Sequence, residues 1–452
     1  MLSRIINIGI FSIIFVNAIV LFKTPFEFYI NYIPLLILLF IFFFKFKFPT
    51  KLLYIFLPLL LFGLINIFFD NNTMADFFKI YINVFIAVLF FYYVFEYYNR
   101  DTTYFFSIYM QFCIMVAILG IIQLISYKIG FRLGYHYGWL GFNKWGITPG
   151  SVLGIRINSI FSEPSYFAAT LGPAFFIAFY NLVFQKNYFI NRNGSILIVV
   201  TYLLTFSTVA YLGVFFTLLL LLINFGFVRY VFLIIPIVAS LFYYLYQNVD
   251  EFTVRMDGIN ELYFNDVLKT ESSDNTVDEY KKQFKPKVNV LGKIHGSSFV
   301  SYNNYIVTKK NFLSNPLFGT GLGSHGIAYQ KYNLNSFIGN QYKFNTSDAN
   351  SMLLRLISET GIAGILFFIL FIRNFYVKRN PFNEKETIQW IVSNAVLVII
   401  LLQLARQGNY TYSGFMAFMW LYYYIGIQNE ESKDVVENEN IQLISDTNLT
   451  TT

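Results

Sequence analysis

The chain has 452 residues, of which 56% are hydrophobic and only 13% are charged. A soluble domain is charged at about a quarter of its positions, so these values exclude a soluble enzyme, a nucleic-acid-binding domain and a disordered chain. The net charge of +7, with 55 Phe and 35 Tyr residues, fits a polytopic membrane protein whose loops lie near anionic lipid. The single cysteine, Cys113, excludes an internal disulfide and a cysteine redox pair.

Long apolar runs between charged residues predict transmembrane helices, since about 20 apolar residues cross the hydrocarbon core. In chain order we expect spans at Ile5–Phe22, Phe28–Phe44, Leu52–Phe69, Ile80–Phe95, Thr102–Tyr127, Pro164–Gln185, Asn193–Val228, Tyr230–Val249, Ser351–Ile372, Thr387–Ala405 and Gln407–Asn429. The run Asn193–Val228 is too long for one pass. We expect it to break near Ser207–Gly213, which gives an all-α polytopic membrane protein of about 12 transmembrane helices.

Basic residues predict which side of the membrane each loop faces. On this topology one set of short loops carries Arg4, Lys45, Lys47, Lys51, Arg100, Lys186, Arg192, Arg229, Arg373, Lys378, Arg379 and Lys385, and the opposite set carries Lys23, Lys79 and Arg406. Because short cytoplasmic loops are enriched in Lys and Arg, both termini are expected in the cytoplasm.

This topology divides the chain into four parts. We expect residues 1–249 to hold helices 1–9, with an outer loop at 128–163, and residues 250–350 to form a large polar outer loop that is folded at least in part. Residues 351–427 would hold helices 10–12, and 428–452 an acidic, disordered cytoplasmic tail.

The first candidate motif lies where the smaller outer loop enters a helix. Arg156 and Glu163 are seven residues apart, and Pro164 suits the first turn of a helix, with Glu163 beside its positive end. The pair could be an anion-binding Arg beside a proton-accepting carboxylate. The same spacing also fits an interfacial cap and a surface charge.

The second motif is the glycine-rich segment Asn315–His325. It lacks the Lys-Ser/Thr of a nucleotide-binding phosphate loop. Glycines such as Gly321 and Gly323 allow either a tight turn or a close approach of bare backbone to a ligand. His325 fits a base or a hydrogen-bond donor, and equally a structural loop histidine.

Two further motifs place charges within or beside apolar helices. Arg355 and Glu359, spaced i, i+4 after Asn350, can pair on one helix face. Charges in a membrane helix normally face a polar interior, so the pair is either functional or a buried structural ion pair. Arg406, at the outer end of a span, fits a phosphate-binding residue or a side chain that snorkels to headgroups.

Five stretches, in this order, resemble the O-antigen polymerase/ligase superfamily of bacterial envelope proteins, and most closely its Wzy polysaccharide polymerases. They are RINSIFSEPSYFA at 156–168, LLTFSTVAYLGVF at 203–215, NPLFGTGLGS at 315–324, NSMLLRLISETGIAG at 350–364 and ARQGNY at 405–410. The stretches cover roughly the C-terminal two-thirds of the chain. The first third is similar in hydropathy only.

The resemblance implies a fold similar to the glycosyltransferase C superfamily and a site outside the bacterial cytoplasmic (inner) membrane. Polymerases of this family move a growing glycan from undecaprenyl pyrophosphate to the next lipid-linked repeat unit, for O-antigen or capsule. The ligase branch typically has His where this chain has Ala349, which favours a polymerase. Many members have Ser-Arg where this chain has Ser207-Thr208. A flippase or transporter for lipid-linked sugars is the alternative from another class.

The resemblance also implies roles for the motif residues. Arg156 and Arg406 would stabilise the leaving pyrophosphate, and Glu163, or else His325, would accept the proton of the acceptor hydroxyl. The expected substrate-binding residues are Arg355, Glu359, Asn350, Ser165, Gly321 and Gly323. No cofactor and no metal ion is expected. The expected partners are an undecaprenyl-pyrophosphate-linked oligosaccharide, membrane lipid, and a chain-length regulator and flippase of the same pathway.

Overall fold

A computed structural model describes residues 2–24, 27–142, 144, 146–150, 152–227, 296–334, 346–380 and 383–431, with scattered residues between 236 and 260. Most of these residues are helical. The helices are α1 (Leu2–Phe15), α2 (Tyr32–Lys45), α3 (Leu53–Phe68) after the 3-10 turn η1 (Thr50–Leu52), α4 (Met74–Tyr97), α5 (Thr102–Lys128), α6 (Arg132–Tyr135), α7 (Pro164–Phe184), α8 (Arg192–Leu203), α9 (Thr208–Asn224), α13 (Gly296–Ser314), α14 (His325–Tyr332), α15 (Met352–Asn374), α16 (Glu384–Arg406) and a last helix over residues 415–431.

Six helical segments of the described chain are long and apolar enough to cross a membrane. They are Thr50–Phe68, Met74–Tyr97, Thr102–Lys128, Pro164–Phe184, Met352–Asn374 and Glu384–Arg406. The protein therefore belongs to the all-α membrane proteins. The apolar helices α1, α2 and α9 are shorter, and most of the expected span Tyr230–Val249 lies outside the described residues. The count of about 12 spans stays a prediction.

The long apolar run after residue 193 is broken close to the expected place. Helix α8 ends at Leu203, and α9 begins after Ser207, whose hydroxyl accepts a hydrogen bond from the Ala210 amide at 3.0 Å. A serine at this position satisfies one of the free amides of the new helix. Side-chain caps of the same kind begin α4, α5, α15 and α16, at Thr73, Asp101, Ser351 and Asn383.

The first two expected spans are wrong in part, because a short hairpin separates the helices. Helix α1 already ends at Phe15, and strands β1 (Val20–Phe22) and β2 (Phe28–Tyr29) pair in antiparallel fashion before α2 begins. Asn17, which lies between α1 and β1, is buried and accepts a hydrogen bond from the Ser162 amide at 3.4 Å. The Asn17 side chain is thus bonded to a distant loop, and α1 does not continue through this position.

The last expected span is also wrong at its start. Residues 407–414 are not α-helical, and they include the 3-10 turn η6 (Tyr412–Gly414). The following helix runs to residue 431, so the first residues of the expected tail are helical. The Gln428 side chain explains this extension, because it bonds Thr102 at 2.9 Å and the Arg100 carbonyl at 2.7 Å. Residues 432–452 lie outside the described residues.

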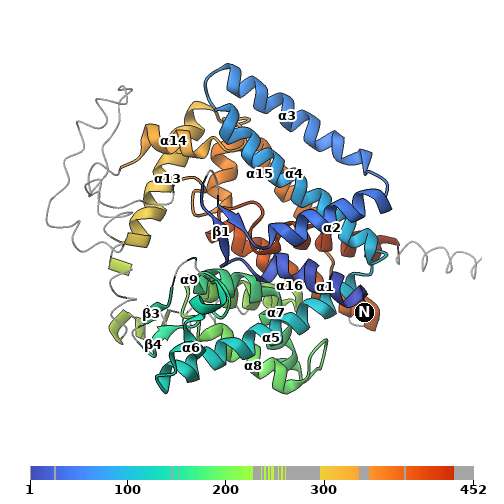
Figure 1. Cartoon of the computed structure of the whole chain (residues 1–452), viewed down its shortest axis with the longest axis vertical. Helices are drawn as coiled ribbons and strands as arrows, with labels where there is room; N and C mark the ends of the chain where they lie inside the picture. The colour runs from blue at the N-terminus through green and yellow to red at the C-terminus, as the bar shows by residue number, and fades with distance from the viewer. Residues whose placement is uncertain are drawn as a thin grey trace, which may run out of the picture.

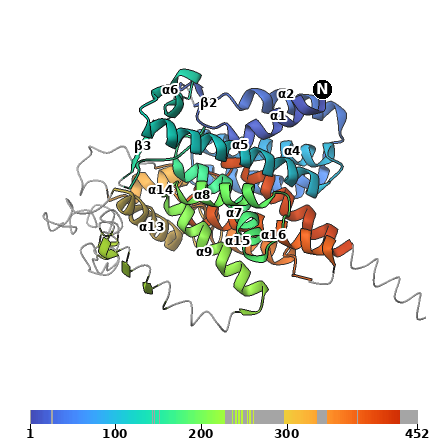
Figure 2. The ribbon, with the colours of Figure 1, turned by 90° about the horizontal axis from the view of Figure 1, so that it is seen from below.

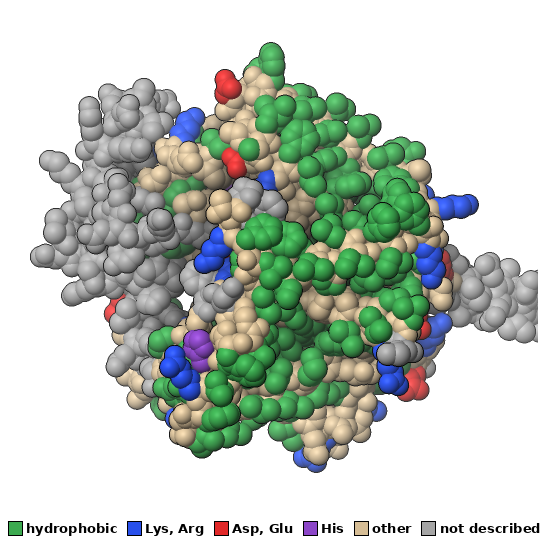
Figure 3. All heavy atoms as spheres, in the orientation of Figure 1, with side chains coloured by type: hydrophobic (Ala, Val, Ile, Leu, Met, Phe, Trp, Pro, Cys, Tyr) green, Lys and Arg blue, Asp and Glu red, His purple; other side chains and the backbone are tan. Residues whose placement is uncertain are grey.

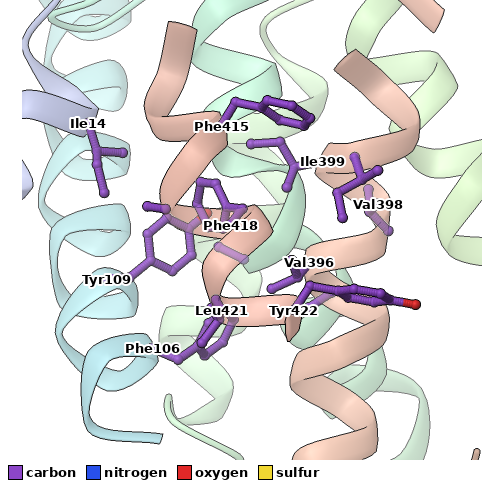
Figure 4. Packing of buried hydrophobic residues seen from close by; sticks show 14 of the residues in the cluster. Ile14, Phe106, Tyr109, Val396, Val398, Ile399, Phe415, Phe418, Leu421 and Tyr422 are labelled. Atoms are coloured by element: carbon purple, nitrogen blue, oxygen red, sulfur yellow. The ribbon is translucent and has the colours of Figure 1, made fainter. Parts of the chain in front are cut away.

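Helices α7 and α16 form the centre of the molecule. In each, 78% of the most apolar stretch is buried, against 22% in Thr50–Phe68. Helix α7 packs against α8, α9 and α16, and these helices lie together in the lower half of Figure 1. Figure 4 shows how side chains of α5, α16 and the last helix, such as Tyr109, Val396 and Phe418, fill the interior.

Apolar side chains also cover much of the surface, as a lipid environment requires. On α2 and α3 the exposed residues include Phe40, Phe44, Tyr54 and Phe68, at 67%, 73%, 82% and 82% exposure. Figure 3 shows apolar side chains across the middle of one face, with most visible Lys and Arg toward its left and right sides. A soluble protein rarely exposes so large an apolar surface.

The two ends of the helical body differ. One end holds the start of α1, the α4–α5 turn and the end of the last helix, since the Tyr98 hydroxyl donates to Asn7 at 2.9 Å and Gln428 bonds Thr102. The opposite end holds α13, α14, β3 (Thr148–Gly150) and β4 (Gly154–Arg156) (Figure 2). The two expected outer loops thus contribute folded elements to one end. Residues 261–295 and 335–345 of the larger loop lie outside the described residues.

Candidate functional site

The first element of the site is a buried ion pair on α15. The Ser351 hydroxyl caps this helix and also donates to the Leu404 carbonyl at 2.8 Å, which fixes α15 against the end of α16. One turn on, Arg355 Nε and Glu359 Oε1 are 2.9 Å apart, and the two side chains are 4% and 0% exposed. The pairing expected from the i, i+4 spacing is therefore confirmed.

Both charged groups have further partners in the segment that follows α16. Arg355 Nη1 donates to the Gly408 carbonyl at 2.9 Å, and the Tyr410 hydroxyl donates to Glu359 Oε2 at 2.9 Å. The Arg355 guanidinium also lies 4.4 Å from the centre of the Tyr410 ring. A buried ion pair is tolerated only with such extra hydrogen bonds. The geometry favours the structural pair among the two interpretations that the spacing left open.

His325, the first residue of α14, lies against the same carboxylate. Its backbone amide is 3.4 Å from Glu359 Oε1, and its ring Nε2 is 3.0 Å from Asn304 Oδ1. Among the described residues its Nδ1 has no hydrogen-bond partner, although the side chain is fully buried. Burial, and then the positive charge of Arg355, lower the pKa of His325 to about 3. His325 is therefore a neutral imidazole at neutral pH.

The glycine-rich segment is a turn that packs directly on α15. Gly319, Gly321 and Gly323 adopt left-handed φ angles of +67°, +91° and +84°. The Gly321 amide donates to the Glu359 carbonyl at 2.8 Å, and a Cβ on Gly319 would lie 2.5 Å from the Glu359 carbonyl carbon. The glycines are thus required by backbone conformation and close packing. A role of Gly321 and Gly323 in substrate binding stays a prediction.

Helix α15 is kinked beside this turn. Gly361 has φ +59° and ψ −149°, and the next amide, that of Ile362, bonds the Pro316 carbonyl at 2.9 Å instead of its own helix. The glycine-rich turn therefore takes up hydrogen-bonding groups that the kink leaves free. It fixes the backbone immediately after Glu359.

Arg406 and Asn350 lie at the same junction of α15 and α16. Arg406 is the last residue of α16, is partly exposed, and donates from Nη1 to the Ser301 hydroxyl of α13. Asn350 has φ +56°, and its amide bonds Asp348 Oδ1 at 3.0 Å. A Cβ on Gly408 would lie 1.4 Å from the Asp348 carbonyl oxygen, so that position requires glycine.

Glu163 and Ser165 begin α7 as expected, with Pro164 in the first turn. The Glu163 side chain does not cap the helix; instead Glu163 Oε2 accepts a hydrogen bond from the Ser165 hydroxyl at 2.9 Å. The neighbouring Tyr166 ring lies 4.2 Å from the Tyr412 ring, centre to centre. Glu163 is partly exposed, which leaves its carboxylate accessible to a ligand.

Arg156 is not paired with Glu163, contrary to one interpretation of their spacing. Arg156 ends β4, and its Nε donates to the Thr205 carbonyl at 3.2 Å, in the break between α8 and α9. Within the part of the chain that the structure describes, no ion pair joins Arg156 to Glu163. The side chain is partly exposed.

The structure thus joins most of the expected residues in one neighbourhood. His325, Gly321, Arg355 and Glu359 contact one another directly, and Asn350 and Arg406 adjoin them at the α15–α16 junction. Asp348 belongs to the same junction, because its carbonyl packs against Gly408. Arg156 contacts the Thr205 carbonyl, in the break between α8 and α9.

Sequence reasoning missed several residues of this neighbourhood. Tyr410, Tyr412 and Asp348 contact or surround the charged groups, and Asn304 contacts His325. Tyr410 ends the ARQGNY stretch and Asp348 comes two residues before Asn350, so their nearness to these motifs was the available signal. Asn304 lies within an expected loop, where no pattern marks it.

Comparison with known proteins does not assign the chain to a family: no family model and no curated protein sequence matches it. The fold therefore defines only a class, that of mostly helical membrane proteins.

Proposed function

We propose that the protein is a polysaccharide polymerase that joins undecaprenyl-pyrophosphate-linked repeat units on the outer side of the bacterial inner membrane. The observation that carries the proposal is that the partly exposed Arg406 adjoins the buried Arg355–Glu359 pair at one end of an apolar helical body. An accessible charge at such a place is costly and marks a functional site. The proposal includes about 12 spans, both termini in the cytoplasm and a fold of the glycosyltransferase C type.

The proposed reaction is a displacement at the sugar carbon that carries the lipid pyrophosphate. The acceptor hydroxyl attacks this carbon, the bond to the pyrophosphate oxygen breaks, and undecaprenyl pyrophosphate leaves with the bond electrons. Glu163, which is partly exposed, accepts the proton of the hydroxyl. Arg406 and Arg156, also partly exposed, bind the leaving pyrophosphate through charge-assisted hydrogen bonds.

The buried groups have a different role in this account. Arg355 and Glu359 are saturated by each other, Gly408 and Tyr410, so they hold the end of α15 against the segment after Arg406. The backbone amide of His325 supports the same carboxylate from the side of α14. These three residues would position Arg406 and leave the chemistry to accessible side chains.

The test is complementation of a strain that lacks this protein, read as the length ladder of its surface polysaccharide. We expect Arg406→Ala and Arg156→Ala to shorten the ladder to a single repeat, whereas Arg132→Ala, a change at an exposed arginine of α6, leaves it intact. A full ladder with both site variants at normal expression would overturn the assigned roles. Normal chains in the deletion strain itself would overturn the function.

Two other outcomes separate the alternatives. Full-length chains that fail to reach lipid A–core would indicate the ligase branch. Repeat units that stay on the cytoplasmic side of the membrane would indicate a flippase. The proposal requires single repeat units that reach the outer side and remain unjoined.

A further inference from the structure

A second group of polar side chains lies beside Glu163, and most of its members fall outside the sequence motifs. Its first half is on the hairpin between α1 and α2. Lys144 Nζ lies 2.6 Å from Glu27 Oε2 and 4.6 Å from the centre of the Tyr29 ring, and the Tyr29 hydroxyl donates to the same carboxylate. Burial acts to raise the pKa of Glu27, but the hydrogen bonds and charge of Lys144 outweigh it and lower the pKa.

The second half is formed by tyrosines of α7 and η6. The Tyr166 and Tyr412 rings lie 4.2 Å apart, and the Tyr412 hydroxyl is 3.2 Å from the Ser162 hydroxyl. These contacts unite segments that are far apart in the sequence.

The two halves form one continuous wall. The loop before α7 joins them, because the Ser162 amide donates to Asn17 Oδ1, just before β1, at 3.4 Å and the Ser162 hydroxyl lies 3.2 Å from that of Tyr412. The Tyr29 ring lies 5.8 Å from that of Tyr32 in an edge-to-face arrangement. Asp348 lies next to the wall, because its carbonyl packs against Gly408, four residues before Tyr412. The four tyrosines of the wall and Asp348 are each partly exposed.

The chemistry of this wall is that of a carbohydrate site. Tyrosine rings offer an apolar face and a hydroxyl, and carboxylates accept two hydrogen bonds from adjacent sugar hydroxyls. The charges are Glu27, Glu163 and Asp348 against Lys144 and Lys23, which leaves one negative charge in excess. Like charges placed together cost free energy, so an acidic sugar is disfavoured here.

We propose that Tyr29, Tyr32, Tyr166 and Tyr412, with Glu27, Asp348 and Lys144, form a subsite for an uncharged sugar residue of the repeat unit. The inference rests on the proposed function, because it divides the substrate between two surfaces. Arg406 and Arg156 bind the anionic pyrophosphate, and the tyrosine–carboxylate subsite holds the sugar whose hydroxyl faces Glu163.

A small pocket adjoins the subsite. Lys144 also lines this pocket, together with Tyr137, Phe142, Gln123 and Asn158. The two amides bond each other at 2.9 Å and fix the pocket wall. Its volume of about 30 Å³ is that of a water molecule, so the sugar itself lies on the tyrosine–carboxylate side of Lys144.

Saturation-transfer NMR on the full-length protein in lipid nanodiscs tests the subsite without any catalysis. The probes are maltotriose, tri-N-acetylchitotriose and trigalacturonate. We expect transfer to at least one of the uncharged trisaccharides and a several-fold weaker signal for trigalacturonate. Tyr29→Ala should reduce the transfer at least five-fold, whereas Tyr54→Ala, a change at a tyrosine 82% exposed on α3, should leave it unchanged.

A charge variant keeps the test decisive if an alanine variant fails to fold. Glu27 is exposed, and Glu27→Lys should raise the trigalacturonate signal several-fold. Equal transfer to all three probes, or transfer that neither Tyr29→Ala nor Glu27→Lys alters, would overturn the inference. Sugar binding by a protein that joins no repeat units would overturn the proposed function alone, and joining without sugar binding would overturn the subsite alone.

Discussion

Arg355 and Glu359 form an ion pair of 2.9 Å in the interior of an apolar protein, one turn apart near the start of α15. Around it, Gly408 accepts from Arg355, and Tyr410 donates to Glu359. The pair thereby connects α15 to the non-helical segment after α16. The first prediction concerns how much this ion pair stabilises the junction.

Removing one partner of the pair should destabilise the protein strongly. Glu359→Ala leaves the Arg355 guanidinium buried without its carboxylate, and we expect a loss of about 3–5 kcal/mol in the free energy of unfolding. Replacement of both residues by apolar ones, as in Arg355→Met with Glu359→Leu, should restore part of that loss. Thermal unfolding of the purified protein in detergent measures both effects.

A more exposed pair at the end of α4, between Glu96 of the helix and Arg100 of the following turn, is the matched control. Arg100 and Glu96 have the same spacing and a distance of 2.8 Å, but the Arg100 side chain is 55% exposed. Arg100→Ala should therefore cost less than about 1 kcal/mol. Equal losses for Glu359→Ala and Arg100→Ala would contradict the structural role assigned to the buried pair.

The kink of α15 should depend on glycine. Gly361→Ala places a Cβ in a backbone region that only glycine adopts freely, 2.5 Å from the Pro316 carbonyl oxygen, and should destabilise the protein by about 1–3 kcal/mol. Gly326→Ala in α14 is the control, because open space surrounds that position and alanine favours a helix by about 1 kcal/mol. Opposite shifts of the melting temperature are expected, and shifts of equal sign and size would refute this explanation of the kink.

The protein should lose stability in acid, because His325 is buried in its neutral form. Its pKa falls from 6.5 to about 3 on folding, so between these values the unfolded chain binds a proton that the folded protein does not. Stability is therefore complete above pH 6.5 and declines as the pH falls toward 3. Because other groups titrate too, the measurement is the difference in melting temperature between wild type and His325→Gln. That difference should shrink in acid, and a constant difference would contradict the prediction.

Glu163 is predicted to act in the chemical step. Glu163→Gln keeps the size of the side chain and its bond with Ser165 but cannot accept the proton, so the rate of joining should fall about 10²–10⁴-fold. Ser165→Ala should have a smaller effect, since it removes one hydrogen bond to the carboxylate. Initial rates with purified protein, and equal melting temperatures for both variants, are the measurements. An unchanged rate for Glu163→Gln would remove Glu163 from the mechanism.

The fold could be predicted from apolar runs, but the helix boundaries could not. The expected spans lie between charged residues. Helix α4 instead begins at Met74 and includes Asp76 and Lys79, because Thr73 caps it. The hairpin β1–β2 falls inside two expected spans, since Phe and Leu suit a strand as well as a membrane helix. The pattern of apolar residues alone predicts neither the cap that begins α4 nor the hairpin.

The site was predictable only where its residues are close in sequence. The i, i+4 spacing of Arg355 and Glu359 predicts their pairing, and Glu163-Pro164 predicts the start of α7. The partners Gly408 and Tyr410 come from a segment that is not helical, and their place depends on packing against Asp348. The contact between Glu27 and Lys144 joins two loops that share no pattern.

The most direct test of the central claim is reconstitution of the purified protein with the lipid-linked repeat units that accumulate in a strain lacking it. The account predicts products that grow by one repeat at a time, with one undecaprenyl pyrophosphate released for each bond formed. Repeat units that remain single, with no pyrophosphate carrier released by a correctly folded protein, would contradict it.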